Sequence, residues 1–184
     1  MYKLIFFICT KFLNTQMHEI ILVRHAKSDW GNEFLKDIDR PLNQRGYDAA
    51  YVASNWFLTT KNMPNLMLSS TATRALNTAL IFARTLNFNM TNFVLQSEVY
   101  ESSENSLIDI ISKLQNQNKT VMLFGHNPSI TNVCNKLSND LFFDNVPTCG
   151  IVSLLFDINN WADIKTTNAK LNYHQFPKNY KNND

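Results

Sequence analysis

An apolar run that ends in two basic side chains, Leu22-Val23-Arg24-His25, constrains the fold of this chain more than any other feature. A residue such as Val23 belongs in a buried strand, whereas Arg24 and His25 are costly to bury without partners. Open α/β sheets bind their ligands at the carboxyl ends of their strands. A buried strand that ends in these side chains is therefore expected to place them in a crevice.

Two later segments repeat this pattern. Residues 66–70 form an apolar run that leads to Arg74, and residues 121–124 form another that leads to His126. Three predicted strand ends thus supply two arginines and two histidines. This set suits the binding of an anionic phosphoryl group and a nucleophile that attacks it.

Hydrophobic spacing predicts strands that alternate with helices along the chain. The strands are predicted at residues 19–23, 66–70, 93–95, 120–124 and 151–156, with an edge strand at 161–170. The helices are predicted at residues 43–58, 71–86, 103–114 and 128–137, with Asn43 as a cap and Pro128 in the first turn. Such alternation predicts an α/β fold with a mainly parallel central sheet and helices on both faces.

Length and charge limit the classes of function. The 184 residues fit one domain, and 17 basic against 15 acidic residues give a net charge of only +2. Because no strong positive field or basic cluster exists, nucleic-acid binding is not expected. Cys9, Cys134 and Cys149 lack metal-ligand spacing and are interpreted as reduced thiols of a cytoplasmic protein, the latter two buried.

The two ends of the chain are expected to lie outside the folded domain. The apolar stretch at residues 4–9 is shorter than the core of a signal peptide, and Met17 precedes the first strand. Residues 1–16 are interpreted as a mis-called leader or a disordered extension, with membrane contact as the weaker alternative. Residues 178–184 are polar and are expected to fray, which leaves 17–177 as the domain. No stable membrane association is expected.

The four basic side chains permit a specific chemistry. His25 can act as a covalent nucleophile, while Arg24 and Arg74 bind phosphoryl oxygens through their fixed fork of donors. His126 would be a further donor to the transferring group, favourable if it is protonated. No metal or cofactor is expected, since the cationic side chains can neutralise the phosphoryl charge.

Several short motifs occur in a fixed order. They are Arg-His-Ala-Lys-Ser at 24–28, Asp39-Arg40-Pro41-Leu42 followed by Arg45-Gly46, Ser70-x-x-x-Arg74-Ala75 with Thr78-Ala79, and Gly125-His126-Asn127-Pro128. This set resembles the histidine phosphatase superfamily, also called phosphoglycerate mutase-like, and within it the short SixA-type phosphohistidine phosphatases. The resemblance covers about residues 18–177. Ala26 stands where most of the superfamily has glycine, as is common in the SixA-like branch.

The resemblance implies a compact phosphoglycerate mutase-like fold without a large cap insertion. It implies that His25 is the phosphorylated residue, and that Arg24, Arg74 and His126 complete the phosphate pocket. Larger members carry an acidic proton donor at the place where Glu101 falls. Glu101 is therefore the candidate general acid, and an ordinary solvent-facing role is the alternative.

Acidic residues of the first loop are the other candidates for the general acid. They are Asp29, Asp37 and Asp39, of which Asp39 is expected to form a local ion pair with Arg40. Ser70 could hydrogen-bond near His25, although a turn or cap role suits it equally.

The resulting functional hypothesis is a metal-independent phosphatase with a phosphohistidine enzyme intermediate. Its expected substrate is phosphohistidine on a signalling protein, because the short loops between the motifs predict an open pocket. A small-molecule phosphomonoesterase and a non-catalytic phosphate-recognition module are the alternatives. A mutase is disfavoured because no insertion offers a second phosphate site.

Overall fold

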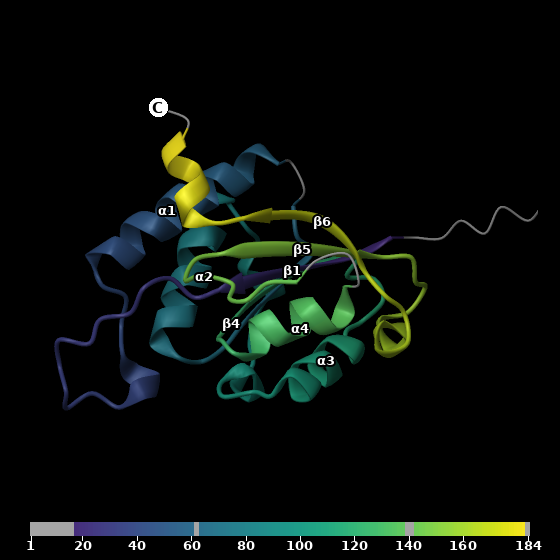
Figure 1. Cartoon of the computed structure of the whole chain (residues 1–184), viewed down its shortest axis with the longest axis horizontal. Coiled ribbons are helices and arrows are strands. Elements are labelled where there is room, and N and C mark those ends of the chain that lie inside the picture. The colour runs from purple at the N-terminus through teal and green to yellow at the C-terminus, as the bar shows by residue number, and fades with distance from the viewer. Residues whose placement is uncertain (1–16, 61–62, 139–141, 183–184) are drawn as a thin grey trace, which may run out of the picture.

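A six-stranded sheet forms the centre of the computed structural model, which describes residues 17–60, 63–138 and 142–182 (Figure 1). Its strands are β1 (His18–Arg24), β2 (Leu66–Ser69), β3 (Phe93–Leu95), β4 (Thr120–Gly125), β5 (Ile151–Phe156) and β6 (Lys170–Gln175). They lie in the order β3-β2-β4-β1-β5-β6. The first four are parallel, and β5 runs antiparallel to both of its neighbours, so the predicted mainly parallel sheet is confirmed.

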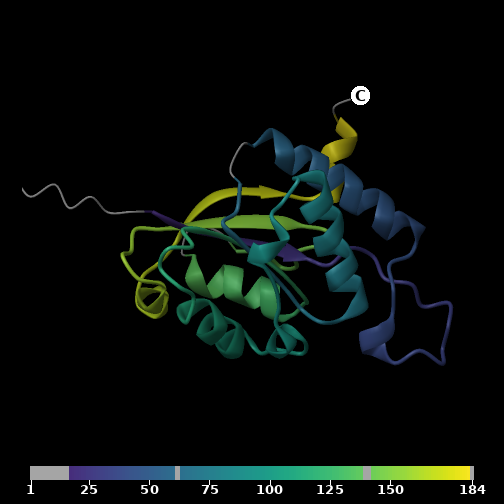
Figure 2. The same ribbon diagram turned by 180° about the vertical axis from the view of Figure 1, so that it is seen from behind.

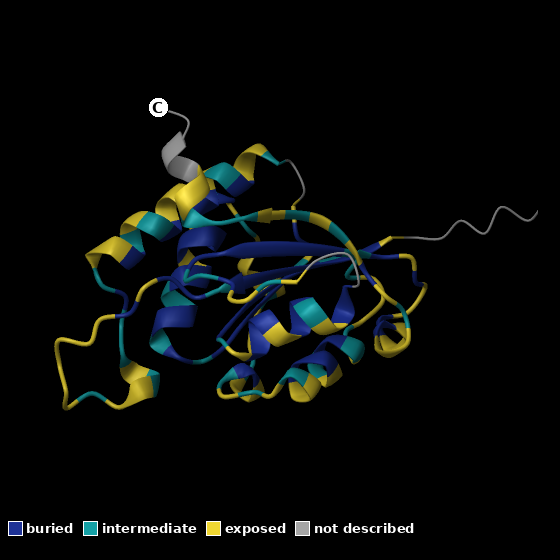
Figure 3. Ribbon diagram, in the orientation of Figure 1, coloured by how far each residue is buried: buried dark blue, intermediate teal, exposed yellow. Residues whose placement is uncertain are grey.

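Helices cover both faces of this sheet, as the alternation of elements predicted. One face packs against α1 (Gln44–Thr59) and α2 (Thr73–Thr85), and the other against α3 (Glu104–Ser112) and α4 (Ser129–Leu137) (Figures 1 and 2). Successive side chains of β1 point to opposite faces. Ile20 and Leu22 pack in the core beneath α3 and α4, and Ile21 and Val23 in the core beneath α1 and α2. The central strands are accordingly buried along their length (Figure 3).

The start of α1 is fixed against the first loop of the chain. Asn43 caps the helix as predicted, since its side chain accepts a hydrogen bond from the backbone N–H of Gly46 at 2.9 Å. A Cβ atom at Gly46 would collide with the backbone carbonyl of Lys27, so only glycine permits this approach. The same carbonyl accepts a hydrogen bond from the backbone N–H of Asn43 at 3.0 Å. The helix therefore holds the backbone two residues after His25.

The predicted edge strand at residues 161–170 is wrong. Trp161–Lys165 form a 3-10 helix, and the edge strand on this side of the sheet is β6, which begins at the predicted end, Lys170, and ends at Gln175. Trp161 and Ile164 lie one helical turn apart and are both buried in the core, which supplied the apolar signal. The strand β6 alternates only between exposed and half-buried positions, so its sequence carries little hydrophobic pattern.

The structure describes the carboxyl-terminal segment up to Asn182, whereas at the amino terminus its description begins at Met17. Pro177–Asn182, in the segment predicted to fray, form a 3-10 helix beside α1 (Figure 1). The interpretation of residues 1–16 lies outside the described residues.

Pro128 is the N-cap of α4 rather than a first-turn residue. Cys134 and Cys149 are buried free thiols, as predicted. Within the described ranges, no helix is both long and apolar enough to cross a membrane.

Candidate active site

The three basic strand ends predicted from the sequence meet at one edge of the sheet. The strands β2, β4 and β1 are adjacent and parallel, so their carboxyl ends lie side by side. The backbone N–H of His25 donates to the carbonyl of Gly125 at 3.0 Å, which joins the ends of β1 and β4. The rings of His25 and His126 lie 5.0 Å apart between centroids. The first turn of α2 adds Arg74, whose electrostatic interaction with both histidines places it in the same cluster.

The tautomer of His25 leaves one ring nitrogen free to attack. Its Nδ1 lies 2.7 Å from the backbone carbonyl of Ala26, which can only accept a hydrogen bond. Nδ1 therefore carries the proton, and Nε2 presents a lone pair. The backbone N–H of Ala26 donates to the Thr78 hydroxyl at 3.0 Å, and that hydroxyl donates to the carbonyl of Arg74 at 2.7 Å. The orientation of the His25 ring is thus tied to the first turns of α2.

Burial keeps His25 neutral. Burial, together with the nearby charges of Arg74 and Arg24, lowers the pKa of His25 to about 4, although the hydrogen bond with Ala26 and the charge of Asp37 act in the opposite direction. The whole residue is only 9% exposed. At neutral pH the ring is thus in the unprotonated form that nucleophilic attack requires.

His126 is arranged as a neutral donor. Its Nε2 lies 2.8 Å from the Ser70 hydroxyl, whose oxygen also accepts from the backbone N–H of Ala72 at 3.2 Å. In the neutral tautomer that accepts the Ser70 hydroxyl proton at Nε2, the ring proton is on Nδ1. Burial, and then the charges of His25 and Arg74, lower the pKa of His126 to about 3. Protonation would favour the predicted donor role of His126, but its lowered pKa keeps the ring neutral at neutral pH.

Two buried N–H groups of the cluster lack protein acceptors. Among the described residues, neither Nδ1 of His126 nor Nε of Arg24 has a hydrogen-bond partner. The Nη1 group of Arg24 is held by the Val146 carbonyl at 2.7 Å and by the Asn145 side chain at 3.1 Å. Buried polar groups are seldom left unpaired, and an oxyanion would accept from both of these.

The first loop contributes an acidic side chain to this cluster. The carboxylate of Asp37 accepts from Nη2 of Arg74 at 2.7 Å and from the Tyr100 hydroxyl at 2.9 Å. Its backbone carbonyl accepts from Nη1 of Arg74 at 2.5 Å. Arg40 pairs with this same carboxylate, Nε to Oδ1 at 4.0 Å. The expected ion pair of Arg40 with Asp39 is therefore replaced by one with Asp37.

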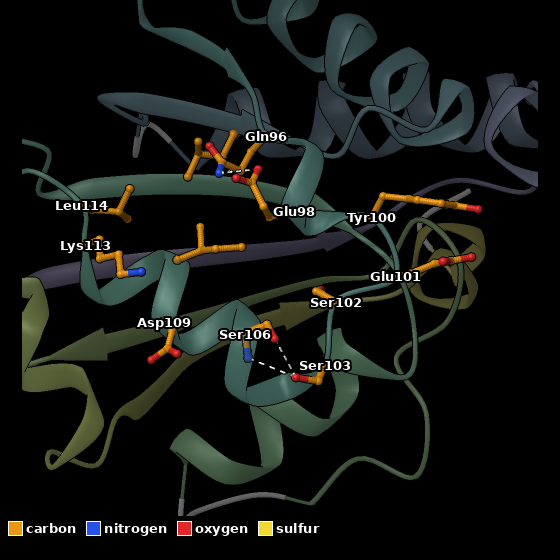
Figure 4. Close-up of a pocket in the computed structure, with 12 residues that line it drawn as sticks. Gln96, Glu98, Tyr100, Glu101, Ser102, Ser103, Ser106, Asp109, Lys113 and Leu114 are labelled. Carbon is orange, nitrogen blue, oxygen red and sulfur yellow. Dashed lines mark hydrogen bonds between the residues drawn. The ribbon is translucent and has the colours of Figure 1, made fainter.

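Glu101 lies at the margin of the cluster. It is exposed, its backbone has a φ of 53°, and its carboxylate lies beside the Tyr100 hydroxyl. Burial, together with hydrogen bonds to Asp37 and Glu101, raises the pKa of Tyr100 to about 12. Tyr100 and Glu101 also line one end of an open pocket of about 660 Å³ along α3, and Figure 4 shows both side chains directed away from the rest of its lining.

The segment before β5 fixes the backbone at the end of β1. The backbone N–H of Cys149 donates to the carbonyls of Arg24 and His25 at 3.0 and 3.1 Å, and this residue has a φ of 62°. Sequence reasoning missed Cys149, Asn145 and Val146 as parts of the site. Cys149 and Val146 act through backbone atoms, which carry no signal in residue type.

The lowered pKa values predict how stability depends on pH. In the unfolded chain the pKa of His25 is near 6.5, whereas in the folded protein it is about 4. As the pH falls, His25 therefore takes up its proton at a higher pH in the unfolded chain than in the folded protein. The free energy of unfolding should therefore decrease from pH 6.5 toward pH 4, with His25 accounting for about 3 kcal/mol. Urea unfolding of the wild type and of His25→Asn at pH 7.5 and 4.5 tests this. A variant with the full wild-type pH dependence would contradict it.

Comparisons with known proteins agree with this geometry. The sequence profile of the histidine phosphatase superfamily (branch 1) matches residues 20–103. An uncharacterised chloroplast protein of Arabidopsis thaliana is 32% identical over 158 residues, which are 78% of this chain and 69% of that protein. An uncharacterised protein of Mycobacterium tuberculosis is 27% identical over 158 residues, which are 81% of this chain and 96% of that protein.

Solved structures share the whole fold. A protein of Agrobacterium tumefaciens proposed to be the phosphohistidine phosphatase SixA has a TM-score of 0.74 and 27% identity, covering 86% of this chain and 97% of its own. The protein histidine phosphatase SixA, solved with tungstate, has a TM-score of 0.75 and 20% identity, covering 88% and 98%. The fold of this chain is therefore that of the compact SixA structures.

Proposed function

Because this chain is a phosphatase that belongs to the histidine phosphatase superfamily, we propose that it acts through a phosphohistidine intermediate formed on His25. The observation that carries the proposal is the hydrogen bond from Nδ1 of His25 to the Ala26 carbonyl. It fixes the ring with the lone pair of Nε2 available, in a cluster of Arg24, Arg74 and His126. A neutral, oriented imidazole among anion-binding groups is suited to attack phosphorus.

The proposed reaction has two displacements at phosphorus. In the first, the lone pair of Nε2 of His25 forms a bond to phosphorus as the bond to the leaving group breaks. In the second, water attacks the phosphoryl group, the bond from phosphorus to Nε2 breaks, and inorganic phosphate leaves. Arg24, Arg74 and Nδ1 of His126 donate to the phosphoryl oxygens in both transition states. These donors neutralise the transferring charge, so the proposed mechanism is independent of a metal or other cofactor.

The proposed substrate is phosphohistidine on a signalling protein. Two structures with the same fold carry the description of a phosphohistidine phosphatase or a protein histidine phosphatase. These two structures also cover 86% and 88% of this chain, which leaves little of it for a segment that could cover the pocket. We place the catalytic domain at residues 17–177. The buried free thiols of Cys134 and Cys149 agree with the proposed cytoplasmic location.

The test is phosphate release in EDTA from a phosphohistidine-bearing phosphotransfer domain, beside a panel of small phosphomonoesters. We expect metal-free turnover with a kcat/KM at least tenfold higher on the phosphorylated domain than on any ester. A preference for the esters would overturn the signalling substrate while keeping the site. Binding without turnover on every substrate would instead indicate a phosphate-recognition module and contradict the phosphatase mechanism.

A further inference from the structure

Asp37 is held in the phosphate site by groups from two other parts of the chain. It belongs to η1 (Asp37–Asp39) in the loop between β1 and α1. Arg74 on α2 grips both its backbone carbonyl and its carboxylate, and Tyr100, which follows the 3-10 helix Ser97–Val99, donates to the same carboxylate oxygen. The Asp37 side chain is 45% exposed, yet the residue is held by three hydrogen bonds from two others. The contacts give the carboxylate one fixed position.

The groups around the Asp37 carboxylate include those proposed to bind phosphate. Besides Arg74 and Tyr100, its carboxylate interacts electrostatically with His25 and His126, and Arg40 approaches from its own loop at 4.0 Å. Burial raises the pKa of Asp37, but the hydrogen bonds from Arg74 and Tyr100 outweigh burial and hold that pKa below its ordinary value. With these contacts the group is a carboxylate at neutral pH.

Arg74 can hold this carboxylate and a phosphoryl group together. Its Nη1 donates one hydrogen bond to the Asp37 carbonyl and its Nη2 donates one to the Asp37 carboxylate. The remaining N–H groups of the guanidinium are available to phosphoryl oxygens. A phosphoryl group bound by these remaining N–H groups would lie next to the Asp37 carboxylate.

We infer that Asp37, rather than Glu101, exchanges the proton of the reaction proposed above for His25, on which this inference rests. In the first displacement, protonated Asp37 gives its proton to the leaving oxygen or nitrogen as the bond to phosphorus breaks. In the second, the Asp37 carboxylate takes a proton from the attacking water. This second step leaves Asp37 protonated. The proton then leaves with the product as dihydrogen phosphate, which returns Asp37 to the carboxylate of the resting protein.

The substrate itself supplies the first proton. A phosphate monoester loses its second proton near pH 6, so its monoanion predominates below pH 6 and still makes up about a tenth of the ester at pH 7. When the phosphoryl group shares Arg74, Asp37 loses part of the stabilisation of its charge and gains a neighbouring anion. The proton of the monoanion then passes to Asp37, and the phosphoryl group remains as the fully ionised form that the donors bind.

Glu101 is less suitable for this role. Its carboxylate is exposed and lies beside Tyr100, whose hydroxyl stands between it and Asp37. Tyr100 is therefore a positioning residue: it links both carboxylates, but it directs its own proton to Asp37. Its ring also packs against the ring of His126, with centroids 5.7 Å apart, which fixes the hydroxyl relative to the site.

The inference is tested with a series of phosphate esters whose leaving groups range from nitrophenol to simple alcohols. A nitrophenolate leaves without a proton, whereas an alkoxide needs one, and general acids contribute about 10²–10⁴-fold. Asp37→Asn keeps an acceptor for Arg74 and Tyr100 but carries no transferable proton. We expect it to lower kcat for alkyl esters about 100-fold or more and for the nitrophenyl ester less than tenfold. Glu101→Gln should lower both by less than threefold.

The outcomes separate this inference from the proposed function. A uniform loss across the series in Asp37→Asn would show a positioning role only and overturn the inference. If Glu101→Gln instead loses more kcat as the leaving group becomes more basic, the proton donor is Glu101, and the inference for Asp37 is overturned as well. Wild-type turnover together with phosphorylation of His25 keeps the proposed function in either case. Absence of both in the wild type would overturn the proposed function first.

Discussion

Replacing His25 by alanine is expected to lower phosphate release by about 10⁴-fold or more, because the nucleophile of a covalent mechanism cannot be bypassed. The remaining donors can still bind a phosphoryl group, so binding of inorganic phosphate should persist. Circular dichroism and thermal unfolding at pH 7.5 would show a folded variant. The measurement is single-turnover phosphate release on the preferred substrate.

The matched control is His174→Ala, which removes an exposed histidine on β6. Its turnover should stay within twofold of the wild type. His25→Asn gives a second variant of similar size to the native side chain, which guards against a packing defect in the alanine variant. Hydrolysis by either His25 variant at a rate comparable to the wild type would sink the nucleophile assignment.

The second large effect is expected from Arg74→Ala. This change removes a buried arginine that we propose donates to the phosphoryl oxygens, and it leaves the Asp37 carboxylate without its closest cation. Losing a donor to transition-state charge costs about 10²–10³-fold in kcat. Arg74→Lys keeps the charge but not the fork that reaches Asp37 and phosphate together, so it should recover only part of this loss.

Arg84→Ala is the control on the same helix. Arg84 lies in the last turn of α2 and is exposed, so its loss changes the helix charge without touching the site. Steady-state kinetics of the three variants should show a fall in kcat for Arg74 substitutions only. An unchanged rate in Arg74→Ala would remove this residue from the active site.

The sequence predicted the parts of the site that strand ends deliver. Arg24, His25 and His126 follow buried apolar runs, and parallel neighbouring strands bring such ends to one edge. The helices on both faces followed from the alternation of elements for the same reason. In each case a local pattern sufficed, because burial of the strand forces the position of its last residues.

The proposed general acid, Asp37, could not be chosen from such a local sequence pattern. Asp37 and Tyr100 are 63 positions apart, and their hydrogen bond depends on how the first loop folds over α2. No periodic pattern in that loop distinguishes Asp37 from Asp29 or Asp39. The neutral state of His126 is likewise a result of three-dimensional burial, and residue type alone does not determine it.

The measurement that tests the central claim most directly is the trapping of the covalent intermediate. The wild-type protein would be mixed with a labelled phosphoryl substrate, quenched in alkali within milliseconds, and digested for mass spectrometry. The mechanism predicts an acid-labile phosphoryl group on the peptide that carries His25, and its absence from His25→Ala. Turnover without any phosphorylated peptide, or with the label on another residue, would contradict the mechanism.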